Sequence, residues 1–499
     1  MRPGKKGAAL VAAFFISFAA HALDRAALEK LASGDNDEKI EAIGALVTEG
    51  DPRAVELLTR FAEGEVEIEG KKSEVVVNNR LRSAVADALA ALRLLAPDRA
   101  ARFAAAKELA GGADAKMLPL VRKALEKETD ADIRPLLELA AASMEMKSGD
   151  KAQRLAAIRT LGGSASPNSK TLLAEAARDT DEDIRAEAQK GLREVEGRLA
   201  WGERAGLLFA GVSLGSILLL AALGLAITYG LMGVINMAHG ELIMIGAYAT
   251  YVVQGFFRNT QFFDWYLLAA VPASFVVSAL VGMALERGVI RWLYGRPLET
   301  LLATWGISLM LIQAVRTLFG AQNVQVENPA FMSGGLQVLS NVVLPWSRIV
   351  IVFFAAAVLL VMYLLLTKTR LGLFVRGVTQ NRAMASCVGV PTGRVDTWAF
   401  GLGSGIAGLA GCALSQLGNV GPDLGQGYIV DSFLVVVFGG VGQLAGTVYA
   451  ALTLGFANKF LEAWSGAVLA KIALLVFIIF FIQKRPQGLF AVKGRAVET

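Results

Sequence analysis

Three polar side chains, Asn236, His239 and Glu241, lie close together in a strongly apolar part of the chain. An amide, an imidazole and a carboxylate can exchange hydrogen bonds or protons with a polar solute. The uncharged stretch before them, residues 207–231, is long enough for a membrane helix of about 20 residues, and apolar residues 242–257 follow directly. Because polar groups are costly beside hydrocarbon, the cluster is expected to face a protein-lined or water-filled pathway.

A second interpretation fits the same residues. A short loop at the lipid headgroups, bounded by Gly233 and Gly240 as helix breakers, would hold these side chains at little cost. His239 is one of two histidines in the chain, and the other, His21, falls in a segment expected to be removed. Neighbouring apolar segments carry further hydrogen-bonding groups, so the candidate pathway set is Thr228, Asn236, His239, Glu241, Thr304 and Ser308.

The composition predicts two different parts in one chain. Of 499 residues 54% are apolar, too many for an ordinary soluble protein, yet 19% are charged, too many for a pure membrane bundle. Most acidic residues precede Arg204. The net charge is +5, and basic residues lie beside the apolar segments. Such residues usually set the orientation of the spans in the membrane, so the charge does not indicate nucleic-acid binding. Cys387 and Cys412 are the only cysteines, too few for a disulfide framework or a cysteine zinc site.

The first 22 residues have the pattern of a secretory signal peptide. Arg2, Lys5 and Lys6 precede an apolar run at residues 8–20, and Ala20-His21-Ala22 fits the small-x-small cleavage pattern. The run is too short for a membrane anchor of about 20 residues. The sequence therefore predicts removal of residues 1–22 and export of the following domain.

Residues 23–203 are polar, rich in alanine and leucine, and patterned for helices. Residues 102–109 are echoed at 154–161, and residues 130–134 at 181–185, which are offsets of 52 and 51 positions. This period is close to that of HEAT-like helix pairs, which stack into a curved solenoid with an exposed concave face suited to protein contact. Residues 60–79, rich in glutamate and valine, predict a solvated loop or small hairpin.

Residues 206–490 predict a polytopic helical membrane domain, and residues 491–499 a cytoplasmic tail. Glycines between residues 424 and 462 favour short or broken helices there, so we expect eight or nine spans. With an exported amino-terminal domain, the basic segments after the third, fifth and last spans fall inside, as the positive-inside rule requires. The predicted spans are residues 207–231, 242–257, 266–285, 298–319, 343–366, 397–417, 429–441, 444–460 and 468–482.

The glycine-rich segment at residues 400–411 favours close helix packing, and direct solute contact is the alternative. No glycine-rich segment ends in the Lys-Ser/Thr of a phosphate-binding loop, so no ATPase activity is expected of this chain. The predicted fold is all-α: a membrane domain of about 8–9 spans preceded by an exported α-helical HEAT-like repeat domain.

A long motif resembles a known family. Ala221-Ala-Leu-Gly-Leu-Ala-Ile-Thr-Tyr-Gly-Leu-Met-Gly-Val-Ile-Asn-Met-Ala-His-Gly-Glu-Leu242, followed by Ile245-Gly-Ala-Tyr248, is similar to the signature of LivH-like permeases. These are membrane subunits of ABC importers for branched-chain amino acids and related solutes. The resemblance implies a multi-pass protein of the bacterial inner membrane, in contact with membrane lipid. With the predicted signal peptide, its amino-terminal domain would be periplasmic, and no nucleic-acid partner is expected. The family resemblance also implies three kinds of partner: a second, LivM-like permease, two cytoplasmic ATPases and a periplasmic solute-binding protein. No cofactor is expected on this chain, because the partner ATPases bind the ATP.

The polar segment at residues 368–396 resembles the coupling segment of ABC importer permeases, on which an ATPase pushes. The family pattern is Glu-Ala-Ala, three residues, then Gly, and Ala383, Met384, Ala385 and Gly389 match its positions without the acidic residue. A basic loop held by anionic lipid is the alternative. The candidate coupling residues are Arg370, Gln380, Asn381, Arg382, Ala383, Ala385 and Gly389.

Within that family, the exported extension and the ending Arg485-Pro-Gln-Gly-Leu-Phe490 resemble the urea branch. The residues alone are compatible with urea but do not select it over a branched-chain amino acid. Two functions of other classes also remain open. One is a passive urea channel, which would leave the coupling-like segment unexplained, and the other is a membrane receptor or scaffold built on the solenoid.

Overall fold

The computed structural model describes residues 30–31, 35–49, 53–62, 65–68, 71–74, 78–112, 115–146, 150–339 and 341–490. The predicted signal segment and the predicted tail lie outside these ranges. Contacts divide the chain into two compact units, residues 1–201 and 202–499, and helix α11 (Glu182–Met232) contributes to both.

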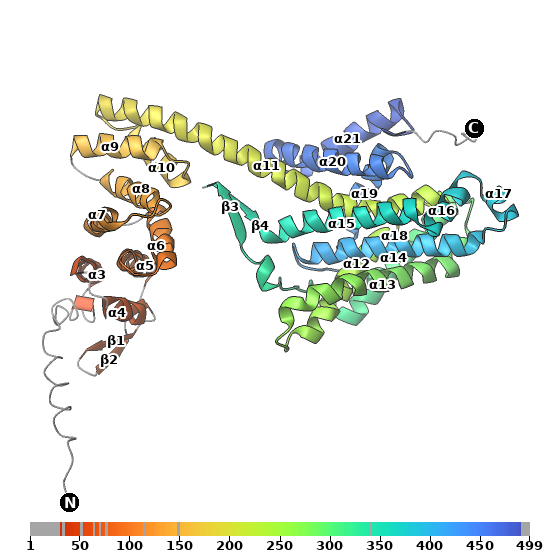
Figure 1. Ribbon diagram of the computed structural model, residues 1–499, viewed down its shortest axis with the longest axis horizontal. Coiled ribbons are helices and arrows are strands. Elements are labelled where there is room, and N and C mark those ends of the chain that lie inside the picture. Colours follow the sequence, from red (N-terminus) through yellow and green to blue (C-terminus); the bar gives the residue numbers. More distant parts are fainter. Residues whose placement is uncertain are drawn as a thin grey trace, which may run out of the picture. The chain divides into compact units, whose positions relative to one another are not determined.

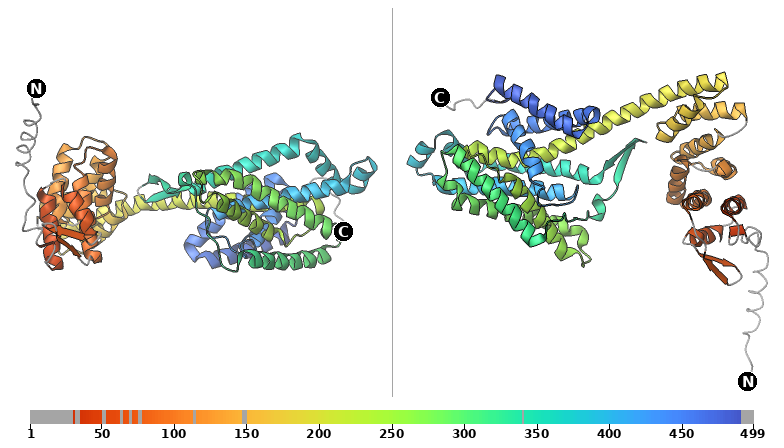
Figure 2. Two further views of the ribbon diagram at one scale, coloured as in Figure 1. Left: turned by 90° about the horizontal axis from the view of Figure 1, so that it is seen from below. Right: turned by 180° about the vertical axis from the view of Figure 1, so that it is seen from behind.

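Unit 1 is an array of short helices that pack side by side (Figures 1 and 2). Its interior is made of leucine, isoleucine, valine and alanine side chains such as Leu58, Val85 and Leu109, all at most 1% exposed. A β1–β2 antiparallel hairpin confirms the hairpin expected within residues 60–79. The elements are α3 (Asn36–Glu49), α4 (Arg53–Ala62), β1 (Glu65–Ile68), β2 (Lys71–Glu74), α5 (Asn79–Arg93), α6 (Arg99–Ala110), η1 (Ala115–Met117), α7 (Leu118–Lys127), α8 (Arg134–Glu145), α9 (Lys151–Gly162) and α10 (Pro167–Ala176).

The two sequence echoes occupy equivalent places in unit 1. At the start of α6, Arg99 pairs with Asp130 at 2.6 Å, and Arg102 pairs with the buried Glu128 at 2.8 Å. These hydrogen bonds hold the pKa of both carboxyl groups below their ordinary values. The same arrangement recurs 51 or 52 positions later at the start of α9, where the pairs are Lys151 with Asp181 and Arg154 with Asp179. The echoed sequence therefore builds the same ion-paired helix junction twice.

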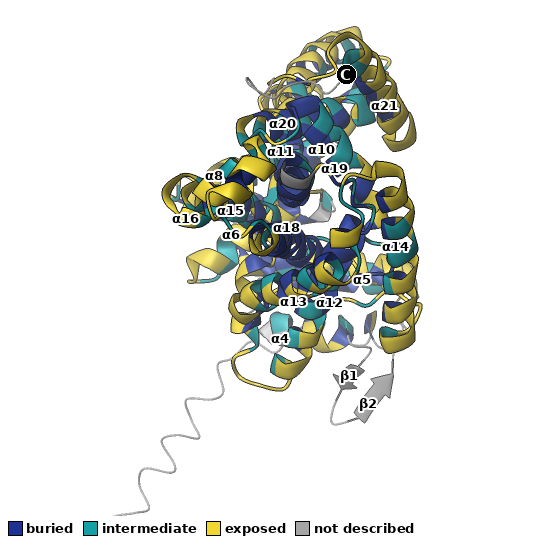
Figure 3. Cartoon of the chain, turned by 90° about the vertical axis from the view of Figure 1, so that its right-hand side faces the viewer, coloured by how far each residue is buried: buried dark blue, intermediate teal, exposed yellow. Residues whose placement is uncertain are grey.

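In the described residues, unit 2 is a bundle of long apolar helices with three short 3₁₀ turns and a hairpin. Figure 3 shows α18 buried along most of its length, while α14, α15 and α21 expose much of their surface. The elements are α12 (His239–Phe257), η2 (Phe263–Trp265), α13 (Tyr266–Gly288), η3 (Ile290–Trp292), α14 (Pro297–Phe319), η4 (Ala330–Met332), β3 (Gly335–Leu339), β4 (Val342–Pro345), α15 (Trp346–Lys368), α16 (Arg370–Gln380), α17 (Arg382–Cys387), α18 (Thr392–Ser415), α19 (Gln426–Gly439), α20 (Leu444–Ser465) and α21 (Ala467–Lys484).

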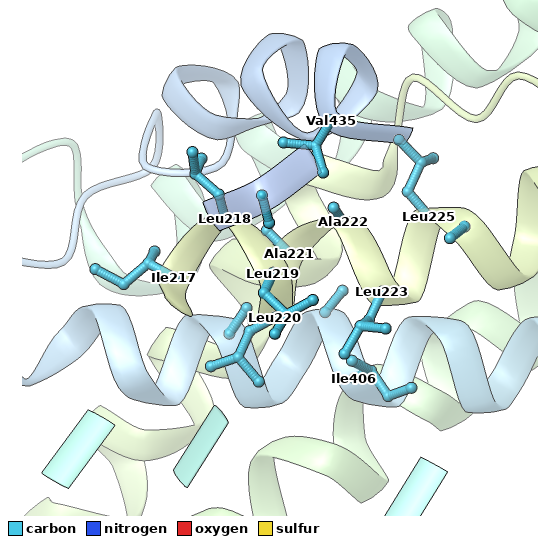
Figure 4. Packing of buried hydrophobic residues seen from close by; sticks show 14 of the residues in the cluster. Ile217, Leu218, Leu219, Leu220, Ala221, Ala222, Leu223, Leu225, Ile406 and Val435 are labelled. Carbon is cyan, nitrogen blue, oxygen red and sulfur yellow. The ribbon is translucent and has the colours of Figure 1, made fainter. Parts of the chain in front are cut away.

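The centre of unit 2 is packed around α11 and α18. The stretch from Ile217 to Leu225 on α11 meets Ile406 of α18 and Val435 of α19 in one apolar cluster (Figure 4). Helix α18 also packs closely against α12 and α13 along its glycine-rich segment. At Gly411, an added Cβ would lie 2.7 Å from the Ala247 nitrogen of α12. This segment makes close helix contacts, as small residues do in membrane bundles.

Six helices of the described residues are long and apolar enough to cross a membrane: the apolar part of α11, then α13, α14, α15, α18 and α21. The number is smaller than the eight or nine spans expected. Helix α19 has only 14 residues, as its glycines predicted. Helix α20, in contrast, runs unbroken for 22 residues, so the expectation of a broken helix is wrong there. Its Gly446 lies against the Gly439 backbone and permits close packing rather than breaking the helix.

Two further boundaries differ from the sequence-based expectation. Helix α11 begins at Glu182, 25 residues before the predicted first span, because its polar and apolar halves both favour a helix and no proline or turn separates them. An antiparallel hairpin has its first strand, β3, in the polar segment at residues 320–341 and its second, β4, at residues 342–345, where the predicted fifth span begins; its register is irregular between Gln337 and Leu339. Its strands carry β-branched and leucine side chains, and it was not predicted.

Candidate functional site

The polar cluster is built on the break between α11 and α12. Helix α11 ends at Met232, and Gly233 follows with φ of +64°, a conformation that glycine adopts without strain. The chain then turns back so that Asn236 precedes the first turn of α12, where its Oδ1 accepts a hydrogen bond from the Ala238 nitrogen at 3.0 Å. Gly233 therefore breaks the helix as predicted.

Gly240 does not break a helix, contrary to expectation. It lies inside α12, and a Cβ added there would be 2.7 Å from the carbonyl oxygen of Gly425, just before α19. The absence of a side chain serves close approach between α12 and the start of α19, so the cluster is bracketed by one turn and one helix contact.

His239 opens α12 and is fully buried. Its Nε2 lies 2.9 Å from the carbonyl oxygen of Ala221. A carbonyl can only accept, so Nε2 carries the proton and donates it. Ala221 precedes the end of α11 by 11 residues, about 16 Å along the helix axis at 1.5 Å per residue. The imidazole thus lies beside the middle of the first apolar span, which favours an interior position over a headgroup loop.

Two residues of α14 meet the α11–α12 break. Ser308 donates through its hydroxyl to Oε1 of Glu241 at 2.8 Å, and the hydroxyl of Thr304 accepts from the Met237 nitrogen at 3.2 Å. Both hydroxyl groups and the carboxylate are buried, with at most 4% of each residue exposed. Thr228 is also buried, but its hydroxyl donates to the carbonyl of Leu225 one turn earlier. The structure therefore brings Glu241 and Ser308 together, while Thr228 is satisfied within its own helix.

Three buried polar atoms of this cluster have no hydrogen-bond partner among the described residues. They are the Asn236 Nδ2 donor, the His239 Nδ1 acceptor and the Oε2 acceptor of Glu241. Leaving a buried polar group unpaired costs about 1–3 kcal/mol, so folded proteins rarely do so without a reason. The cluster has unused capacity for a polar solute that supplies both donors and acceptors.

A pocket of about 130 Å³ opens next to Asn236. Apart from Asn236 its lining is largely apolar and aromatic, and comes from α11, the α11–α12 break and α19. The lining residues are Leu225, Tyr229, Ile235, Asn236, Met237, Ile429, Val430 and Phe433. A mostly apolar pocket with one polar group that orients the ligand is typical of small-molecule sites.

The predicted coupling segment forms two short helices. Thr369 caps α16 by accepting from the Gly372 nitrogen, and Asn381 caps α17 by accepting from the Met384 nitrogen. Gly389 follows α17 with φ of +85°. Most of the candidate set is exposed, whereas Ala385 is buried. The exposed members are Arg370, Gln380, Asn381, Arg382, Ala383 and Gly389.

Sequence reasoning did not identify two buried carboxylates near this segment. Asp396 forms an ion pair with Arg382, and Glu286 accepts from Thr397 at 2.7 Å. Each is a single acidic residue at the end of an apolar run, where a charge normally marks the membrane boundary. Only the tertiary contacts reveal that both are buried. In the sequence, the available hint was that each is a single acidic residue near the end of an apolar segment.

The part of the chain that contains the polar cluster and the predicted coupling segment is similar to known proteins. Residues 207–482 match the family described as branched-chain amino acid transport system / permease component. The permease BraD of Pseudomonas aeruginosa is 27% identical over 290 residues, which is 56% of this chain and 94% of that protein. LivH of Escherichia coli K12 is 28% identical with the same coverage, and a probable LivH of Methanocaldococcus jannaschii is 24% identical over 57% of this chain and 91% of its own. No solved structure matches the chain significantly.

Proposed function

The chain belongs to the family of branched-chain amino acid transport system permease components, and we propose that it is the membrane permease subunit of an ATP-driven ABC importer for urea or short-chain amides. It would form the translocation pathway with a second, LivM-like permease. Two cytoplasmic ATPases would bind and hydrolyse ATP, and a periplasmic binding protein would deliver the solute. The protein would reside in the bacterial inner membrane.

The observation that carries this proposal is the half-satisfied polar cluster at the α11–α12 break. It offers the unused amide NH2 of Asn236, which carries two N–H donors, and two unused acceptors, on His239 and Glu241. A solute that presents both N–H donors and a carbonyl acceptor complements this set, and urea has four N–H bonds and one carbonyl oxygen with two lone pairs. The exported extension and the ending Arg485-Pro-Gln-Gly-Leu-Phe490 also support the urea branch.

A branched-chain amino acid is the second candidate solute. The pocket beside Asn236 is lined mainly by apolar and aromatic groups, including Tyr229 and Phe433, which suits an aliphatic side chain. The printed names of BraD and LivH refer to such solutes. A passive urea channel and a membrane scaffold are functions of other classes. Neither accounts for the exposed short helix α17 and the Gly389 turn at the predicted coupling positions.

We further propose nine membrane-embedded helices, of which α12 and α19 traverse only part of the bilayer. Support comes from the contact between Gly240 and Gly425, which brings the starts of these two helices together beside the middle of the first span. Partial helices that begin at mid-depth are a recurrent way to build a solute site in transporters.

For unit 1 we propose a periplasmic, HEAT-like repeat that docks the binding protein or the partner permease. The repeated ion-paired junctions at α6 and α9 support a repeat architecture. Deleting residues 23–199 while preserving export and membrane insertion is expected to impair uptake. Undiminished uptake by that variant would refute docking.

The solute is decided by uptake measurements in cells whose copy of this gene is deleted and then restored. We expect loss of energy-dependent labelled-urea uptake, rescued by the gene and not competed by leucine. If urea uptake is unchanged while leucine uptake is lost and rescued, the amino-acid importer replaces the urea importer. Uptake of urea that persists after ATP depletion would instead support the channel.

A further inference from the structure

A second buried polar cluster lies where α13 ends and α18 begins. Glu286, near the end of α13, is 2% exposed. The hydroxyl of Tyr294 donates to its Oε1 at 3.0 Å, and the hydroxyl of Thr397 on α18 donates to its Oε2 at 2.7 Å. Both carboxylate oxygens are therefore bonded, each to a different segment of the chain, and the carboxylate joins α13, α18 and the loop after η3.

The short helix α17 is attached to the same cluster through Arg382. Its guanidinium forms an ion pair with Asp396, the neighbour of Thr397 on α18, and its Nη1 lies 3.3 Å from Oδ1. The guanidinium also lies 5.1 Å from the centre of the Tyr294 ring. The Asp396 side chain is only 3% exposed, while that of Arg382 is 45% exposed. Removing Arg382 would leave a buried carboxylate without its counter-charge.

The remainder of α17 divides into an anchored side and a free side. Ala385 of α17 is buried against α16 and α18, whereas Met384 of α17 and Val388, which follows its last residue, are 61% and 71% exposed. Exposed apolar side chains on a short helix suit a groove in another subunit. A force applied to this surface would reach α18 through the Arg382–Asp396 pair.

Helix α18 then connects the anchor to the candidate pathway. Its Gly411 lies against Ala247 of α12, and its Gly403 faces Thr228 of α11. At glycine contacts of this kind, the two helices have little freedom to slide independently. A displacement of α17 is therefore expected to move α18 and α12, and α12 begins with His239 and carries Glu241.

We propose that Arg382, Asp396 and Glu286 are positioning residues, which transmit displacement of α17 by the partner ATPase to the α12–α13–α18 block. The inference rests on the proposed transport function. None of the three residues lines the pocket beside Asn236. In place of the acidic residue that the family pattern has at the coupling helix, Arg382 supplies the ionic link to the bundle.

The test uses the complete transporter in proteoliposomes with its ATPases and binding protein, and labelled urea as the probe. Labelled leucine replaces urea if the wild-type complex transports leucine. Arg382→Ala and Asp396→Asn are expected to lower the solute transported per ATP hydrolysed about fivefold or more, while basal ATP hydrolysis persists. Arg382→Lys keeps the charge and is expected to restore part of the ratio. Arg287→Ala removes an exposed arginine that neighbours Glu286 and lies outside residues 368–396, and the ratio should stay at the wild-type value.

A second measurement reports directly on α17. Cys387 at its end is exposed and Cys412 is buried, so a spin label reacts at one position of the whole protein. In Asp396→Asn the label is expected to become more mobile. An unchanged ratio of transport to hydrolysis, or an unchanged label mobility, in Asp396→Asn would overturn the proposal. If the wild-type complex shows no ATP-dependent uptake of either solute, the proposed function fails instead, and the mobility measurement still tests the anchor.

Discussion

The close contact between α12 and α18 gives a quantitative test of the bundle. At Gly411 an added Cβ would lie 2.7 Å from the Ala247 nitrogen and closer still to the carbonyl oxygen of Ile243. Ordinary contacts need about 3.5 Å, so Gly411→Ala must separate the helices locally by more than about 1 Å. Overpacking of this kind costs roughly 1–3 kcal/mol, and the helical preference of alanine over glycine returns about 0.5–1 kcal/mol. We expect a net destabilisation of about 1–2 kcal/mol.

Cys412, directly after Gly411, provides the assay because its thiol is buried. After Cys387→Ser removes the exposed thiol, labelling of Cys412 requires local opening of the bundle. A loss of 1–2 kcal/mol should increase the labelling rate about 5- to 30-fold. Gly393→Ala is the matched control on the same helix, because a Cβ there meets no atom of the described residues within 4 Å. If Gly411→Ala and Gly393→Ala label at equal rates, the packing argument is wrong.

Three further outcomes are expected. Glu241→Gln should reduce uptake about tenfold. Ser308→Ala should reduce it less, because the serine supplies only one hydrogen bond to that carboxylate. Uptake of labelled solute at matched membrane abundance measures both effects. Gly389→Arg should uncouple ATP hydrolysis from uptake in the reconstituted complex, because φ of +85° strains any side chain by roughly 1–2 kcal/mol, and normal coupling would contradict the coupling assignment. Glu128, whose pKa is lowered by its hydrogen bond to Arg102, stabilises unit 1 above its ordinary pKa of 4.5, and this contribution is lost as pH falls through the lower folded value. Arg102→Ala should therefore shift the acid-induced rise in hydrogen exchange of α6 and α7, measured on the whole protein, to higher pH.

Local patterns in the sequence predicted much of this fold. Apolar length located the six long apolar helices, the positive φ of Gly233 agrees with the predicted helix break, and the echoes near residues 102 and 154 correspond to equivalent junctions. These features depend on residues close together in the chain, and such patterns can be recognised in a single sequence.

Features that depend on distant residues could not be predicted in this way. A glycine that breaks a helix and one that admits a neighbouring helix look alike in sequence, and only the contact with Gly425 assigns Gly240 to the second kind. The burial of Glu286 and Asp396 likewise depends on Tyr294 and Arg382, which lie on other elements. For the same reason, the candidate pathway residue Thr228 could not be distinguished in advance from those with unused hydrogen-bonding capacity.

Glycine content and the polar cluster, which are separate features of the sequence, depend on each other in the structure. A Cβ added at Gly224 would lie 2.9 Å from Cε1 of His239 and would also clash with the carbonyl of Gly403 on α18. Gly224 therefore makes room both for the imidazole and for the approach of α18 to α11. With a larger residue there, the ring could not reach the Ala221 carbonyl, and the half-satisfied cluster would have to leave the interior. The small residues of α11 and α18 are thus a condition for placing ionisable groups at this depth, in addition to their effect on packing.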